Sequence, residues 1–180
     1  MGAILTYTGK SLDPLSPDPD AIVIEDIAHA LSNICRYTGH VRRFYSVAEH
    51  AFRVSFLVPD QDRMWGLLHD ASEAYIGDVA RPIKRMTSWY SDVEDALMEV
   101  ICLKFGLPYG MPESVHTADN DLLVAEARAL MPESDDPRLV WPRQKNDVAV
   151  DPDGLGWLPS MAEVMFLSRY NQLRKVREAA

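Results

Sequence analysis

Cysteine is scarce in this sequence, with two residues among 180, and no Cys-x-x-Cys motif occurs. A chain of this length can bury a sufficient core without disulfides, so Cys35 and Cys102 are expected to be buried free thiols in a reducing cytoplasm. The sequence also has no long apolar run, and it does not start with the basic segment followed by an apolar segment that is typical of a secretory signal. We therefore expect no membrane span, no leader and a cytoplasmic location.

Positive charge is in the minority, with 18 Lys and Arg against 27 Asp and Glu and a net charge of −9. This balance argues against nucleic acid or an anionic membrane as a partner. It would also repel an anionic substrate unless basic residues gather locally. Two short segments carry the basic residues that could form such a local positive pocket: Arg36, Arg42, Arg43, Arg81, Lys84 and Arg85. Of these, Arg42, Arg43 and Arg85 are expected to be solvated instead.

Apolar residues recur with helical periodicity over most of the chain, after an irregular N-terminal segment at 1–23 in which AILTYTGK is a possible strand. Ser46 with Glu49, and Ser160 with Glu163, have the capping-box spacing that starts a helix. DVARPIKR and residues 132–159 are expected to be loops. The sequence predicts one all-α domain over residues 1–180, with helices near 24–35, 46–58, 61–76, 88–105, 114–131 and 160–177.

The stretch LLHDASEAYIGD, residues 67–78, carries unusual charge for a helix with many apolar neighbours. Adjacent His69 and Asp70 on a helix project about 100° apart, so one metal ion between them can bind both. His50 lies on the preceding predicted helix, and antiparallel packing would bring it beside His69. The fifth predicted helix offers a fourth ligand, either Asp119 or Asp121. Imidazole and carboxylate ligands suit Zn, Mn, Fe or Co and leave positions open for water and substrate.

A structural role is the simpler interpretation of any one of these residues. His69 alone would be read as a core histidine, and Asp70 alone as a solvated charge. The joint occurrence of His50, the His69–Asp70 pair, Glu73 and Asp78 favours a site instead. His29 and His116 are expected to be structural.

The runs SVAEH, LLHDASEAYIGDVARPIK and ADNDLLVAEA resemble the HD-domain metal-dependent phosphohydrolases. The closest resemblance is to the branch of YfbR-like 5′-deoxynucleotidases and phage DatZ-type dATP triphosphohydrolases, and IEDIAHALSNICRYTGHVRRFYSVAEH is similar to the same branch. The resemblance covers residues 22–131. The resemblance implies a single HD-domain helical bundle of about six helices, in a bacterial or phage-infected host cytoplasm.

The same resemblance implies roles for particular residues. The metal ligands would be His50, His69, Asp70 and Asp119, with Asp121 as the alternative fourth ligand. Glu73 would act on the nucleophilic water or the leaving group. Asp78 would orient that water or the scissile phosphate.

Three further residues match substrate-binding positions of this branch. Arg36 matches an arginine that contacts phosphate or sugar, and Tyr37 matches an aromatic residue beside the sugar. Lys84 is a further phosphate-binding candidate. Gly39 departs from the pattern, because the dATP-specific enzymes have a larger side chain near this place, and this argues against strict adenine specificity.

The resemblance implies a metal-dependent phosphohydrolase acting on deoxyribonucleotides, either a dNMP 5′-nucleotidase or a dNTP triphosphohydrolase. Its cofactor would be a divalent transition metal, Zn, Co or Mn, its partner a small-molecule deoxynucleotide, and a homo-oligomer is compatible with this branch. A cyclic-nucleotide diesterase of the HD-GYP type is disfavoured, because the GYP motif is absent. A non-catalytic nucleotide-binding or assembly module with a relic site is also disfavoured, because Glu73 and Asp78 are retained.

Overall fold

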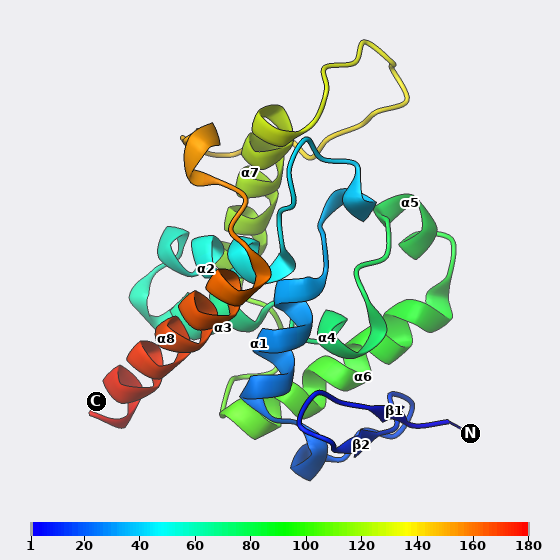
Figure 1. Ribbon diagram of the computed structural model, residues 1–180, viewed down its shortest axis with the longest axis vertical. Coiled ribbons are helices and arrows are strands. Elements are labelled where there is room, and N and C mark those ends of the chain that lie inside the picture. The colour runs from blue at the N-terminus through cyan, green and yellow to red at the C-terminus, as the bar shows by residue number, and fades with distance from the viewer. Residues whose placement is uncertain (1, 180) are drawn as a thin grey trace.

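The protein is described here by a computed structural model of residues 2–179, which is an all-α bundle with one two-stranded antiparallel sheet (Figure 1). The expected fold class is confirmed. The strands are β1 (Ile4–Leu5) and β2 (Ser11–Leu12). The helices are α1 (Ile24–Asn33), α2 (Val47–Leu57), α3 (Arg63–Leu68), α4 (Glu73–Ile76), α5 (Arg81–Lys84), α6 (Ser88–Phe105), α7 (Glu113–Leu130) and α8 (Pro159–Glu178). Four short 3-10 turns are η1 (Pro19–Ala21), η2 (Tyr37–Gly39), η3 (Asp60–Asp62) and η4 (Pro152–Gly154).

Local signals placed several helix ends correctly. The Ser46 side chain accepts a hydrogen bond from the Glu49 N–H at the start of α2, as the capping-box spacing predicts. Helix α6 has the predicted bounds, and Gly106 ends it in the left-handed conformation at φ +62°. These ends depend on residues close in the chain, which is why sequence alone finds them.

Three local predictions are wrong. The last helix begins at Pro159 after Leu158, so Ser160 lies inside α8 and is not its cap. RPIK forms the short helix α5, because a proline in the first turn has the φ that a helix needs. Cys35 lies beyond α1, in a bridge with Ser46, and is only partly buried; both cysteines are free.

The predicted third helix is two helices, and His69 and Asp70 lie where it is interrupted. Between α3 and α4 the backbone tightens to three-residue hydrogen bonds, such as Ala71 N–H to the Leu68 carbonyl. The Nδ1 of His69 lies 2.9 Å from the Gly66 carbonyl oxygen. In a continued α-helix the Asp70 N–H would bind that carbonyl, so the histidine side chain replaces a backbone donor. Gly77, at φ +81°, ends α4 as predicted.

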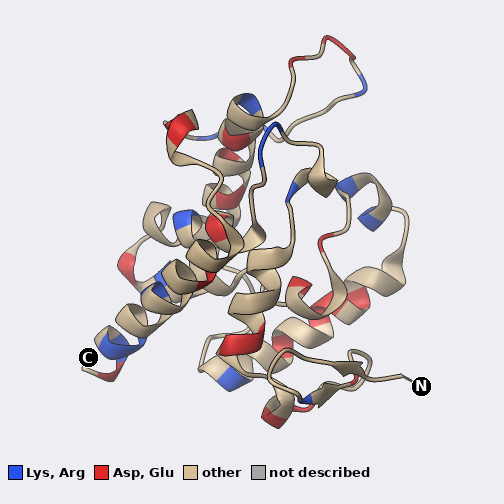
Figure 2. Cartoon of the chain, viewed as in Figure 1, with Lys and Arg blue, Asp and Glu red and all other residues tan. Residues whose placement is uncertain are grey.

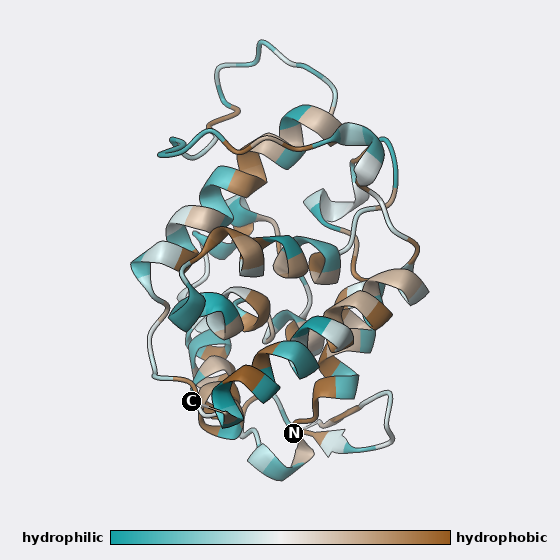
Figure 3. Ribbon diagram, turned by 90° about the vertical axis from the view of Figure 1, so that its left-hand side faces the viewer, coloured by the Kyte–Doolittle hydropathy of each residue, from teal (hydrophilic) through white to brown (hydrophobic). Residues whose placement is uncertain are grey.

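The hydrophobic core lies where α1, α2, α3 and α8 meet, with α7 packed on α2 and α3. Ile27, Leu31, Val54, Leu67 and Phe166 are fully buried there. Apolar and hydrophilic stretches alternate along the helices, as amphipathic packing requires (Figure 3). None of the helices between residues 2 and 179 combines the length and apolar character needed to cross a lipid bilayer.

Gly66 lies at the contact between α2 and α3. A Cβ at this position would stand 3.1 Å from Ser55 Cα and 3.2 Å from Val58 Cγ2. The first neighbour is backbone and cannot rotate away, so a side chain here would force the two segments apart by a few tenths of an ångström. The two histidines of the candidate site lie on these two segments, and their separation depends on this contact.

We therefore expect Gly66→Ala to destabilise the protein. Overpacking costs about 1–3 kcal/mol, and the better helix propensity of alanine returns about 1 kcal/mol, so the net loss should be about 1 kcal/mol in urea unfolding. Gly154→Ala is the control, because its Cβ would meet Asp151 at an ordinary 3.5 Å. Equal stability of the two variants would contradict the close-packing interpretation.

Candidate metal centre

His50 on α2, His69 after α3 and Asp119 on α7 meet in one place. Each offers a ligand atom, and these atoms lie within 4.8 Å of one another. His50 Nε2 is 3.1 Å from Asp119 Oδ1, and His69 Nε2 is 3.9 Å from the same oxygen. Both histidines are buried, and their rings stand edge to face at 5.2 Å. Three residues far apart in the chain thus form a cluster that could hold a metal ion.

The nitrogen atoms of both histidines fit a metal ion. Nδ1 of His69 faces the Gly66 carbonyl and Nδ1 of His50 faces the Glu126 carboxylate; because both partners only accept, both nitrogens donate. The Nε2 atoms therefore point into the cluster and are free to bind a metal ion, which is the usual arrangement of metal-binding imidazoles. His69 Nε2 is buried and lies 3.2 Å from Asp70 Oδ2 without hydrogen-bond geometry, and it has no other hydrogen-bond partner among residues 2–179. A buried polar atom of this kind is the opening that a cation would fill.

The electrostatics of the cluster favour a cation. Burial alone would lower the pKa of His69, but the adjacent Asp70 carboxylate outweighs it and raises the pKa to about 9. Burial opposes ionisation of Asp119, yet the hydrogen bond from His50 and the charge of His69 lower its pKa to about 2. The carboxylates thus remain ionised, and their charge keeps a proton on His69. A metal ion that binds the imidazole would displace this proton.

Asp70 borders the cluster through His69. Its Oδ2 lies 3.2 Å from His69 Nε2 and 3.5 Å from Arg36 Nη1. Burial raises the pKa of Asp70, but the charges of His69 and Arg36 lower it well below its usual range. Asp70, predicted as a metal ligand, is therefore an ionised neighbour of the three-residue cluster rather than one of its members.

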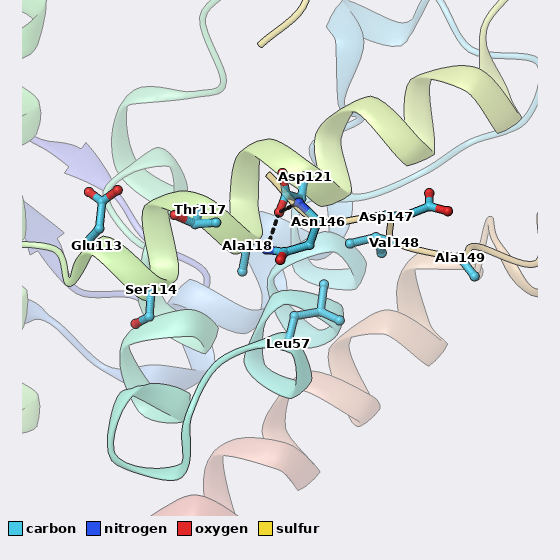
Figure 4. A pocket seen from close by; sticks show the side chains of 10 residues that line it. All are labelled: Leu57, Glu113, Ser114, Thr117, Ala118, Asp121, Asn146, Asp147, Val148 and Ala149. Atoms are coloured by element: carbon cyan, nitrogen blue, oxygen red, sulfur yellow. Dashed lines mark hydrogen bonds between the residues drawn. The ribbon is translucent and has the colours of Figure 1, made fainter. Parts of the chain in front are cut away.

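Of the two alternatives on α7, only Asp119 faces the histidines. Asp121 is buried on another side of the helix, and its carboxylate accepts hydrogen bonds from the N–H groups of Lys145 and Asn146 and from Asn146 Nδ2. It anchors the long segment between α7 and α8. A cavity of about 480 Å³ also opens on this side of α7, lined by Asp121, Asn146 and Thr117 among others (Figure 4).

Glu73 and Lys84, predicted for different roles, lie together. Lys84 Nζ donates to Glu73 Oε1 at 3.2 Å and to Glu94 Oε1 at 2.8 Å. Glu73 is buried, and its Oε2 has no hydrogen-bond partner in the described chain. Burial raises the pKa of Glu73 well above its usual range, and the charges of Asp70 and of partly buried Asp78 raise it further.

The basic residues were predicted to form a local positive pocket, and three of them reach acidic groups of the site. Arg36 is buried beside Asp70. Arg81 places Nη2 3.5 Å from Asp119 Oδ2, and Lys84 pairs with Glu73. Figure 2 shows α5 among the basic segments. The expected solvated residues are exposed: Arg42, Arg43 and Arg85.

Tyr37 is held against α7 by its hydroxyl, which donates to the Leu123 carbonyl at 2.7 Å. Its backbone is left-handed at φ +55°, and the Arg36 guanidinium lies 5.6 Å from its ring centroid. Gly39 follows at φ +78°, and a Cβ there would meet no atom within 4 Å. Backbone conformation, rather than lack of space, thus favours glycine at this position.

Two histidines lie apart from the cluster, as predicted. His29 stacks on the ring of Tyr7 at 3.7 Å, and its Nδ1 is 3.1 Å from Glu163 Oε2. His116 is exposed near the start of α7.

Glu126 is the residue for which sequence reasoning gave no role. It is fully buried, and its carboxylate accepts hydrogen bonds from Tyr45 Oη and from His50 Nδ1. Arg36 Nε lies 3.6 Å from its Oε2. Glu126 follows Asp119 by seven residues, two helical turns, so both project from one face of α7. That spacing in ADNDLLVAEA was the available signal.

Asp119→Asn and Asp121→Asn form a matched pair on one helix. The first should weaken binding of Zn²⁺, Co²⁺ or Mn²⁺ by at least about 10-fold, since even an outer partner of a metal ligand contributes 10–100-fold. The second should leave metal affinity unchanged and speed proteolysis between residues 131 and 158. Calorimetric titration and limited proteolysis test both. Equal loss of metal affinity in the two variants would contradict the assignment of Asp119.

Comparison with known proteins identifies one relative of the whole chain and one of about three fifths of it. No protein-family model matches it. The uncharacterized protein YfdR of Escherichia coli strain K12 is 39% identical over 181 residues, which cover all of both chains. An uncharacterized protein of Rhodobacter capsulatus is 37% identical over 121 residues, 62% of each chain. The identity to YfdR extends from end to end, and the chain therefore belongs to the same protein family as YfdR.

Proposed function

We propose that this protein is a metal-dependent phosphohydrolase of the HD-domain type that acts on deoxyribonucleotides. The observation that carries the proposal is the buried His69 Nε2, which has no hydrogen-bond partner in the described chain and faces His50 Nε2 and Asp119. A cluster with two imidazoles and a carboxylate suits a divalent transition metal, Zn, Co or Mn.

His50, His69 and Asp119 would hold this ion, with Asp70 as the fourth ligand. When bound, a divalent ion supplies Lewis acidity, which acidifies water and polarises a phosphoryl oxygen. The chain's own contribution is to hold the two imidazoles by their Nδ1 atoms, so that both Nε2 atoms face the same point.

Two guanidinium groups support an anionic substrate. Arg36 lies beside Asp70, and Arg81, with 44% of its side chain exposed, lies beside Asp119. Guanidinium groups bind phosphate oxygens through paired hydrogen bonds. On a chain of net charge −9, these guanidinium groups together with a bound metal cation would offset part of the repulsion of a phosphorylated substrate. Lys84 donates a hydrogen bond to Glu73 and is a further candidate contact for phosphate, and Tyr37 would pack against the sugar.

Glu73 and Asp78 would handle the proton. In hydrolysis the water oxygen bonds to phosphorus, the bond from phosphorus to the leaving oxygen breaks, and one proton passes from the water to the leaving group. A buried carboxyl whose pKa is raised, as that of Glu73 is, can carry a proton near neutral pH. Asp78 would orient the water or the phosphate.

The substrate class rests on the resemblance of SVAEH, LLHDASEAYIGDVARPIK and ADNDLLVAEA to the deoxynucleotide-hydrolysing branch. Release of orthophosphate from a dNMP and of triphosphate from a dNTP both break the ester bond between the 5′ oxygen and the α-phosphorus, so the same residues would serve either reaction. We therefore propose deoxynucleotides as the class and leave both reactions to experiment.

The test incubates the protein with Zn²⁺, Co²⁺ or Mn²⁺ and each dNMP and dNTP, and separates the products by chromatography. We expect release of orthophosphate from dNMPs or of triphosphate from dNTPs. EDTA should abolish turnover, and added metal should restore it. Metal binding without turnover of any nucleotide would favour a non-catalytic nucleotide-binding module.

Asp70→Asn should lower turnover by more than about 100-fold, because loss of an outer partner of a ligand already costs 10–100-fold. Asp92→Asn, on the exposed side of α6, is the control and should keep full activity. Circular dichroism should show the same helical content in both variants. Activity of the Asp70 variant near the control level would refute the metal mechanism.

A further inference from the structure

We propose that Glu126 is a positioning residue that orients His50 for metal binding and, through Arg36, supports Asp70. This inference rests on the proposed metal centre and goes beyond it, because Glu126 itself binds neither metal nor substrate. It assigns a role to a carboxylate that is fully buried in the protein.

The environment of Glu126 leaves little room for a purely packing role. A buried carboxylate is costly unless charged and hydrogen-bonding partners surround it. Tyr45 Oη donates to Oε1, His50 Nδ1 lies 3.0 Å from both oxygens, and Arg36 Nε lies 3.6 Å from Oε2. His50 belongs to the metal cluster and Arg36 contacts its neighbour Asp70. All three partners of Glu126 are buried.

The contact with His50 determines which ring nitrogen can bind metal. Because a carboxylate only accepts hydrogen bonds, Nδ1 of His50 must donate, and Nε2 is left for the ion. Both carboxylate oxygens are equidistant from Nδ1, so the ring is held symmetrically. A carboxylate behind an imidazole also makes it a stronger ligand.

The contact with Arg36 extends the influence of Glu126 to the other side of the cluster. The Arg36 side chain is only 8% exposed, with Nε toward Glu126 and Nη1 toward Asp70 at 3.5 Å. Its guanidinium therefore bridges two carboxylates. Since α7 also supplies Asp119, one helix carries a metal ligand and the group that orients a second.

The test measures Co²⁺ affinity for Glu126→Gln in the wild-type and His50→Ala backgrounds. The glutamine keeps the shape of the side chain and removes its charge. We expect about 10–100-fold weaker binding in the wild-type background. In the His50→Ala background the contribution through His50 is already lost and only the contribution through Arg36 remains, so the further loss of affinity should be clearly smaller than in the wild type, because residues that act through one another are not additive.

Tyr45→Phe is the matched control. It removes another hydrogen bond to Glu126 and leaves both contacts to His50 intact, so Co²⁺ affinity should stay within about twofold of the wild type. Glu126→Asp is the second variant should Glu126→Gln fail to fold. It keeps the charge but withdraws the carboxylate from His50, and it should also weaken binding and alter the visible Co²⁺ spectrum.

The outcomes separate this inference from the proposed function. Equal loss of affinity in both backgrounds, or wild-type affinity of a folded Glu126 variant, would overturn the positioning role. A wild-type protein that binds Co²⁺ and hydrolyses no deoxynucleotide would overturn the proposed function while leaving this measurement intact. Failure of the wild type to bind Co²⁺, Zn²⁺ or Mn²⁺ would overturn both.

Discussion

Helices α2 and α3 approach so closely at Gly66 that a Cβ there would lie 3.1 Å from Ser55 Cα. The carbonyl of the same glycine holds Nδ1 of His69. One residue thus permits the contact between the segments that carry His50 and His69, and also orients one of the two rings. The tightened backbone after α3 follows from this hydrogen bond, and so does the position of Asp70. The arrangement of the candidate centre therefore depends on this approach.

Charged side chains are buried around the candidate centre, and several of them have an opposite partner nearby. Arg36 lies between Asp70 and Glu126, while Lys84 donates hydrogen bonds to Glu73 and Glu94. Such pairs add little to stability compared with an apolar core, so their presence favours a role in chemistry. The acidic excess of the chain and the basic residues at the cluster are consistent with an anionic ligand held at a cation.

Much of the helical framework was predictable, because amphipathic periodicity and end signals act over a few residues. Gly106 and Ser46 marked helix ends correctly. The break at His69 was missed, because a side chain that caps a carbonyl leaves no trace in hydrophobic periodicity. The false cap at Ser160 has a different cause: Pro159, whose φ suits the first helical position, starts α8 one residue earlier and leaves Ser160 inside the helix.

The sequence by itself determined the all-α class and singled out His50, His69 and Asp70, since their residue types and spacing are read directly from the chain. Only the tertiary structure showed that Asp119, and not Asp121, lies beside the histidines, and only it revealed the position of Glu126. The two aspartates are two positions apart on one helix and project about 200° from each other. Which side of α7 faces the histidines depends on how α7 packs against α2 and α3, and that packing is decided by contacts between residues distant in the chain.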